Sequence, residues 1–116
     1  MSLKNFDPKD VVRLRHMLDA AEECLTFTRG KGLSSFKKDR KLFLAVIKEL
    51  EIIGEAAGRV SKEVTGAHPE IPWVEITGTR NRLIHAYFDV APETIWNTVE
   101  QSLPGLVKSL KTILKE

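Results

Sequence analysis

The chain has 116 residues, of which 42% are hydrophobic and 29% are charged, and its formal net charge is +2 at pH 7. These values are typical of one soluble globular domain over residues 1–116 and argue against intrinsic disorder, while the small charge neither requires nor excludes an anionic partner. The single cysteine, Cys24, excludes an internal disulfide and a cysteine-based metal cluster, and is best interpreted as a small core residue in a reducing cytosol.

The first helix is predicted over residues 8–28. Asp7 can cap the free N–H groups, Pro8 suits the first helical position, and apolar residues then recur at three- and four-residue steps. The glycines of RGKG at 29–32 favour a left-handed turn that ends this helix. The beginning of the chain has no apolar signal region, and no apolar run is long enough to span a bilayer. We therefore expect a cytoplasmic protein without membrane contact.

A long second helix is predicted over residues 35–64. It carries two apolar stripes, which predict that it is sandwiched between neighbouring helices. Gly54 and Gly58 lie four residues apart on it and lower its helix propensity. We interpret them as small residues that let another backbone approach closely.

The second half of the chain predicts two or three more helices. Residues 65–73 form a loop because glycine and proline interrupt any regular pattern, and a third helix runs over residues 73–87. Pro92 begins a fourth helix, which Pro104 and the following glycine kink or break, leaving a short fifth helix. No segment alternates with period two. The predicted fold class is therefore all-α, a bundle of four or five helices.

Two charged clusters could belong to a site. The basic run KKDRK at 37–41 could face an anionic polymer, although a solvated helix start is the favoured interpretation. Glu49, Glu51 and Glu55 lie near one another on the second helix and could pair with arginines from another helix. Because no histidine or aspartate stands beside them at ligand spacing, we expect no metal site and no cofactor.

The stretch TRNRLIHAYF at 79–88 concentrates hydrogen-bonding side chains near the end of the third helix. At about 100° per residue, Asn81 and His85 lie about 40° apart on one face, and Arg80 and Tyr87 about 20° apart on another. Arg80 and His85 are about 140° apart, so they converge only through a bend, a reaching arginine or a second subunit. Arg82 points elsewhere and is interpreted as a surface or ion-pair residue. The other histidines, His16 and His68, are isolated.

Arg80 and His85 together would suit cleavage of a phosphodiester without a metal. Histidine moves protons near neutral pH, and a permanently charged arginine can hold a phosphate and stabilise a pentacoordinate transition state. A ribose 2′-hydroxyl would be the nucleophile, so the protein would need none. The spacing by itself still favours a structural ion-pair helix over a site.

The residues RNRLIHAYF read as R-x4-H-x-Y, with Asn81 directly after the arginine. This pattern resembles the signature of the HEPN superfamily, and specifically of the HepT-like toxins of HepT/MNT toxin–antitoxin systems. The likeness extends over nearly the whole chain, through segments 46–60, 71–90 and 95–106. One departure is Ala86, which stands where many relatives have glycine.

The resemblance implies an all-α homodimer that acts as a metal-independent endoribonuclease on RNA. By that likeness Arg80 and His85 would be catalytic, Asn81 would support them, and Tyr87 would lie at the edge of the site. The implied partner is an MNT-type nucleotidyltransferase antitoxin, which would neutralise the toxin by transferring AMP to Tyr87.

Three alternatives differ from this hypothesis. A non-catalytic HEPN protein that binds RNA, nucleotides or a partner would typically have lost Arg80 or His85, and this chain keeps both. The nucleotidyltransferase itself would need a Gly-Ser turn and paired metal-binding aspartates, which the sequence lacks. A plain helical interaction domain remains as the default.

Overall fold

The computed structural model describes residues 6–115, whose regular structure is entirely helical. The elements are α1 (Pro8–Thr28), α2 (Leu33–Lys38), α3 (Arg40–Ala57), α4 (Lys62–Ala67), α5 (Trp73–Ala86), the 3₁₀ turn η2 (Tyr87–Asp89), α6 (Pro92–Gln101) and α7 (Leu103–Leu114). The predicted all-α bundle is confirmed. The described residues form five longer helices. Two short helices were not expected as separate elements: α2 connects α1 to α3, and α4 connects α3 to α5.

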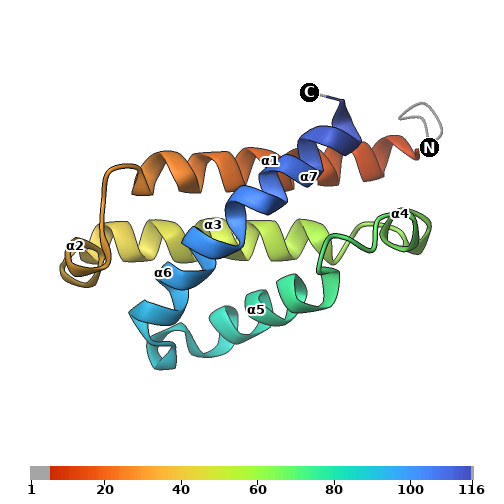
Figure 1. Ribbon diagram of the computed structural model, residues 1–116. Helices are drawn as coiled ribbons and strands as arrows, with labels where there is room; N and C mark the ends of the chain where they lie inside the picture. Colours follow the sequence, from red (N-terminus) through yellow and green to blue (C-terminus); the bar gives the residue numbers. More distant parts are fainter. Residues whose placement is uncertain (1–5, 116) are drawn as a thin grey trace.

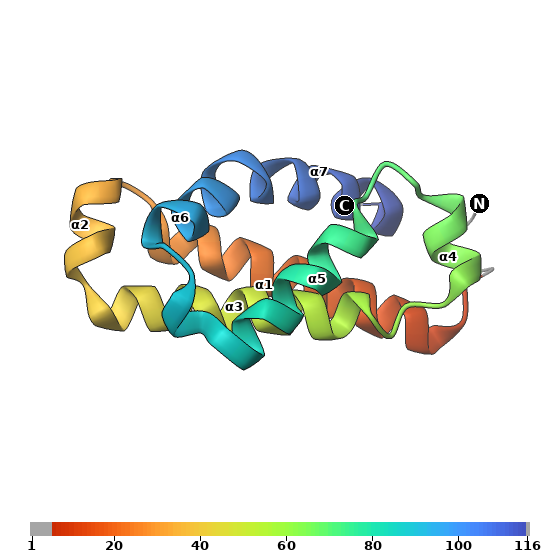
Figure 2. The same ribbon diagram turned by 90° about the horizontal axis from the view of Figure 1, so that it is seen from below.

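The central helix α3 lies between α1 and α5, as its two apolar stripes predicted (Figure 1). α1 and α3 run antiparallel, α5 packs on the other side of α3, and α7 crosses α1 (Figures 1 and 2). The shortest dimension of the molecule is 19 Å. Since a helix with its side chains is about 10 Å across, the bundle is about two helices thick. None of the described helices combines the length and apolar character needed to cross a lipid bilayer.

Local sequence signals fix both ends of α1. The Asp7 carboxylate accepts a hydrogen bond of 2.8 Å from the Lys9 backbone N–H, and Pro8 occupies the first turn. Gly30 has a φ of +75°, the left-handed conformation that glycine adopts without steric cost. The predicted helix over 8–28 and its glycine-rich stop are therefore confirmed.

The continuous helix predicted over 35–64 is wrong, because the chain breaks at Asp39 and again after Ala57. Asp39 is extended, and its carboxylate caps α3 by accepting from the Leu42 N–H at 3.0 Å. After α3, the buried Asp10 carboxylate of α1 accepts from the Ser61 backbone N–H at 2.9 Å and from its hydroxyl at 2.7 Å. This long-range contact fixes the turn before α4, and the apolar periodicity across it gave no sign of the break.

The second half of the chain follows the prediction with small shifts. α4 extends three residues into the predicted loop and ends at Ala67, while α5 ends one residue early, at Ala86. The break between α6 and α7 falls at Ser102 rather than at Pro104. Pro104 stands in the first turn of α7, where its fixed φ is favourable and its missing N–H costs nothing.

A buried carboxyl group lies in the core between α1 and α3. Glu49 is 4% exposed, and its Oε2 atom has no hydrogen-bond partner among the described residues. Burial, followed by a hydrogen bond with Glu23 and repulsion from its charge, raises the pKa of Glu49 to about 7. Burial and the nearby Glu49 likewise raise the pKa of Cys24 to about 12, which keeps this thiol protonated and unreactive.

Replacing Glu49 with glutamine is expected to stabilise the protein at pH 8 and to remove a pH dependence. Because the pKa of Glu49 is raised on folding, its contribution is fully present below about pH 4.5 and is lost as pH rises through 7. The wild type should lose unfolding free energy over this window, and the variant should not. Urea unfolding at pH 5 and pH 8 measures this, with Glu51→Gln as the control on the same helix. A Glu49→Gln protein that is less stable than wild type at pH 8 would contradict the assignment.

Candidate active site

Arg80 lies where α5 packs tightly against Gly54 of α3. A Cβ atom built on Gly54 would overlap the Arg80 Cβ and would lie 2.8 Å from its Cγ, so the glycine is what allows this approach. The interpretation of Gly54 as a contact for a neighbouring helix is thereby confirmed. At Gly58 a Cβ would meet nothing closer than 3.5 Å, and that glycine is not required for the contact.

The guanidinium of Arg80 has two partners in this position. Its Nη2 atom lies 2.7 Å from Glu55 Oε2, and its Nη1 atom donates to Asn81 Oδ1 at 3.1 Å. The Nε atom is buried and has no hydrogen-bond partner among the described residues. The predicted pairing of an α3 glutamate with an arginine from another helix is confirmed for Glu55. Asn81, which shares a face of α5 with His85, also contacts Arg80.

Glu55 binds two arginines with its two oxygens. Its Oε1 atom accepts from Arg59 Nε at 2.9 Å and lies 2.9 Å from Arg59 Nη2. The hydrogen bond from Arg59, followed by the charge of Arg80, lowers the pKa of Glu55. Glu55 is therefore ionised at neutral pH and orients the guanidinium of Arg80. Side-chain contacts of this kind between helices cannot be located from spacing alone.

Arg80 lines a hollow of about 330 Å³ that is bounded by α1, α3 and α5. Basic side chains predominate in its lining: Arg13, His16, Lys48, Arg59 and Arg80. Glu51 and Glu55 are its acidic members, and Ile52 and Ile84 line it with apolar surface. His16, which looked isolated in the sequence, belongs to this basic group. A hollow with this excess of positive charge suits an anionic ligand.

His85 lies on the last turn of α5 and is exposed. α5 is helical from Trp73 to Ala86, so the angle of about 140° between Arg80 and His85 holds in the folded chain. The long arm of Arg80 reaches Glu55 instead of His85. Two of the three ways in which these side chains could converge, a bend and a reaching arginine, are therefore not realised within one chain.

Tyr87 lies beyond the end of α5, in η2. Ala86 has φ −154° and ψ 40°, which ends the helix before the tyrosine. The predicted common face of Arg80 and Tyr87 assumed a helix that continues through residue 87, and that assumption was wrong. Tyr87 is half-buried and lines a second hollow, of about 260 Å³, against the α2–α3 junction.

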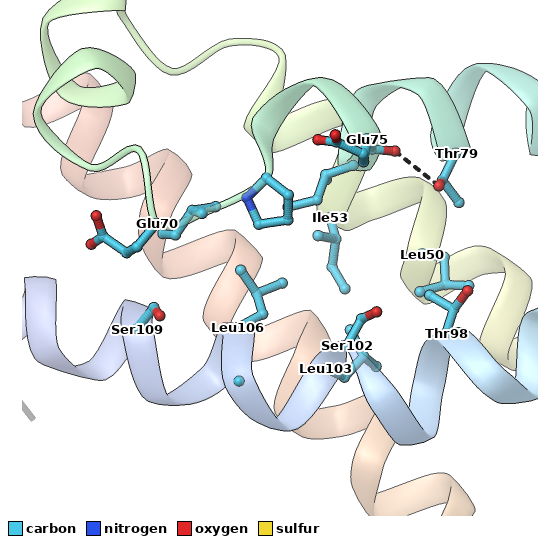
Figure 3. Close-up of a pocket in the computed structure, with 14 residues that line it drawn as sticks. Leu50, Ile53, Glu70, Glu75, Thr79, Thr98, Ser102, Leu103, Leu106 and Ser109 are labelled. Atoms are coloured by element: carbon cyan, nitrogen blue, oxygen red, sulfur yellow. Dashed lines mark hydrogen bonds between the residues drawn. The ribbon is translucent and has the colours of Figure 1, made fainter.

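A larger cavity is lined by none of Arg80, Asn81, His85 and Tyr87. It has a volume of about 500 Å³ and lies between α3, the start of α5 and the α6–α7 junction. Figure 3 shows apolar side chains such as Ile53 and Leu106 between two polar rims. The polar members of its lining are Glu70, Glu75, Thr79, Thr98, Ser102 and Ser109. Its lining includes two carboxylates and no lysine or arginine, so the cavity is unsuited to a polyanion.

Within residues 6–115 no group of three or more His, Cys, Asp or Glu side chains is placed to hold a metal ion.

Comparison with known proteins places the chain in a family. The family model "Ribonuclease HepT-like" matches residues 17–113. A protein of Caldanaerobacter subterraneus named as an RNase is 40% identical over 103 residues, covering 89% of this chain and 92% of that protein. A protein of Thermococcus cleftensis named as a ribonuclease HepT is 39% identical, covering 88% and 93%. One of Methanocaldococcus jannaschii, also named as an RNase, is 34% identical, covering 94% and 92%. No solved structure gives a significant match. The ribonuclease class predicted from the sequence is confirmed, and the chain belongs to the HepT-like ribonuclease family.

Proposed function

We propose that this protein is the toxin of a HepT/MNT-type toxin–antitoxin system and cleaves RNA without a metal ion. The ribose 2′-oxygen attacks the adjacent phosphorus, the bond from phosphorus to the 5′-oxygen breaks, and a 2′,3′-cyclic phosphate forms. His85 accepts the proton of the 2′-hydroxyl and returns it to the leaving 5′-oxygen. Arg80 binds the phosphate and the extra charge of the transition state.

The observation that carries this proposal is the setting of Arg80. Its guanidinium lies in a hollow lined mainly by cations, and its ion-pair partner Glu55 is itself shared with Arg59. A phosphate entering the hollow can therefore take hydrogen bonds from Arg80 while Glu55 remains neutralised by Arg59. Planar, bidentate binding of phosphate is the function for which arginine is best suited. Asn81, bonded to the same guanidinium, would help to fix its plane.

We propose that the complete site forms in a homodimer. Arg80 and His85 point to different sides of α5, so a second copy is the remaining way to bring one arginine to one histidine. Ile84 is 44% exposed and lines the hollow beside Arg80, which gives this surface an apolar contact for a partner subunit. An isologous dimer would contain two equivalent Arg80–His85 sites.

We further propose that an MNT-type nucleotidyltransferase regulates the toxin by transferring AMP to Tyr87. The tyrosine is two residues from His85, and its hollow is lined by Lys37, Lys38 and Arg40, which could hold the added phosphate. Mass spectrometry of the protein after coexpression with the partner should show adenylyl groups on Tyr87. Modification that is confined to other residues would contradict this assignment.

The proposed reaction is tested by incubating the purified protein with single-stranded RNA in EDTA. We expect cleavage to continue, and the products to carry 2′,3′-cyclic phosphate ends. Substrate with a 2′-O-methyl group at the cleaved position should resist, since it lacks the nucleophile. Cleavage that requires added metal, or that yields only 3′-hydroxyl ends, would contradict the proposed mechanism.

A further inference from the structure

An exposed aromatic ring and a group of cations face the same hollow at the end of α5. Phe88 is 72% exposed, which is unusual for a side chain of its size in a small domain. The hollow of about 260 Å³ beside it is lined by Lys37, Lys38, Asp39, Arg40, Phe43, Tyr87, Phe88, Val90 and Pro92. Residues some fifty positions apart in the sequence are thereby brought together.

The α2–α3 side of this hollow is anchored in the core. Phe36 of α2 is fully buried, and its ring centroid lies 5.7 Å from that of Phe43 and 5.0 Å from that of Trp96. The exposed cations Lys38 and Arg40 flank the Asp39 break between two helices that are fixed by these contacts. The α2–α3 side of the hollow is therefore fixed by the packing of the folded bundle.

Two of the cations that line the hollow, Lys38 and Arg40, have no ion-pair partner among the described residues. The Asp39 carboxylate accepts a hydrogen bond from the Leu42 N–H as the cap of α3, and Lys37 lies 3.5 Å from Glu93. Lys38 and Arg40 are both exposed, and the Arg40 guanidinium lies 5.7 Å from the centre of the Phe43 ring. A planar cation beside an exposed aromatic ring, here Phe88, is a combination that binds single-stranded nucleic acid.

We infer that this hollow is a subsite for one nucleotide of a single-stranded RNA, beside the nucleotide that is cleaved. A base stacks on Phe88, and Lys38 and Arg40 bind its phosphate. The α-carbon of Phe88 lies within about 11 Å of that of His85, because three residues span at most about 3.6 Å each. Base stacking on a side chain requires an unpaired base, so the subsite selects single strands over duplex RNA. The inference rests on the proposed function in taking RNA as the ligand.

The test measures binding of a short, single-stranded 2′-O-methyl oligoribonucleotide, which cannot be cleaved, by fluorescence anisotropy over a range of salt concentrations. Phe88→Ala should raise Kd roughly fivefold to a hundredfold without changing the salt dependence, and Phe88→Trp should restore binding. Lys38→Ala combined with Arg40→Ala should also raise Kd, and should lower the slope of log Kd against log salt by about 1.4. All of these positions are exposed, so the variants should fold as the wild type does, which thermal unfolding checks.

The controls are Val74→Ala, an apolar residue 79% exposed at the other end of α5, and Lys62→Ala combined with Lys108→Ala, two exposed cations on α4 and α7. They should leave Kd unchanged. Unchanged binding in Phe88→Ala, or an equal loss in the Lys62 and Lys108 control, would overturn the subsite.

The proposed function is judged separately. If the variants bind as expected but wild type does not cleave ordinary RNA, the subsite stands and the ribonuclease mechanism fails. If Phe88→Ala cleaves RNA with an unchanged KM, the ribonuclease mechanism stands and the subsite fails.

Discussion

Arg80→Ala is expected to lower the rate of RNA cleavage in EDTA by on the order of a hundredfold to a thousandfold, the usual effect of removing one preorganised donor from a transition state. The arginine is positioned by Glu55 and Asn81 in a basic hollow, and its fork would contact the phosphate oxygens directly. Arg80→Lys keeps the charge but loses the two-point geometry, so it should restore only part of the rate. Initial rates on a single-stranded RNA substrate measure all of these variants.

Arg82→Ala is the matched control. Arg82 lies two residues away on the same helix and is exposed, and it lines neither hollow. Its removal changes the net charge by the same amount as Arg80→Ala but should leave the cleavage rate close to that of wild type. Equal losses in the two variants would show that Arg80 acts only through general electrostatic attraction of RNA. An Arg80→Ala protein with full activity would remove it from the site.

Gly54→Ala is expected to destabilise the bundle and to lower activity together. The new methyl group would overlap the Arg80 side chain and would lie 3.1 Å from the carbonyl oxygen of Ile76, so α5 must move away from α3. Overpacking of this kind costs about 1–3 kcal/mol, which at least offsets the roughly 1 kcal/mol that alanine gains over glycine in a helix. Because the displaced contact carries Arg80, the phosphate-binding group moves with it. Urea unfolding and the cleavage rate measure the two effects.

Gly58→Ala separates this packing effect from a general effect of alanine on α3. Gly58 has a φ of −67°, and a Cβ there would make only ordinary contacts, the nearest at 3.5 Å. The substitution should therefore leave stability unchanged or raise it by about 0.4–1 kcal/mol. If Gly54→Ala were as well tolerated as Gly58→Ala, the close approach of α5 at Arg80 would not be a constraint on the fold.

The fold could be predicted from the sequence wherever the signals are local. α1 carries its cap, its apolar stripe and its glycine stop within one segment, and its bounds were predicted correctly. The second helix was predicted as one because Val60 and Val64 continue the apolar stripe of α3. They are buried as expected, but the turn between them depends on a contact from Ser61 to Asp10, which is 51 residues away. No local pattern records that contact.

The candidate site shows the same division. The residues of the motif were found from spacing, and the angle between Arg80 and His85 holds because α5 is regular over both. The partner of Arg80, Glu55, was one of three glutamates that spacing could not separate. Tyr87 was placed on the wrong face because the end of α5 at Ala86 has no proline or glycine to mark it. Nothing in the sequence marks Phe88 as part of a site, since a sequence does not distinguish an exposed aromatic ring from a buried one.

The central claim is that Arg80 and His85 from two copies of the chain form one ribonuclease site, and mixing two inactive variants tests it most directly. His85→Ala should by itself lower the rate by about a hundredfold to ten-thousandfold. When Arg80→Ala and His85→Ala chains are unfolded and refolded together in equal amounts, half of the dimers should be hybrids. Each hybrid should contain one site with both wild-type residues, so about a quarter of the wild-type activity should return in EDTA. Refolded mixtures that stay as inactive as the separate variants, while refolded wild type recovers, would contradict the shared site.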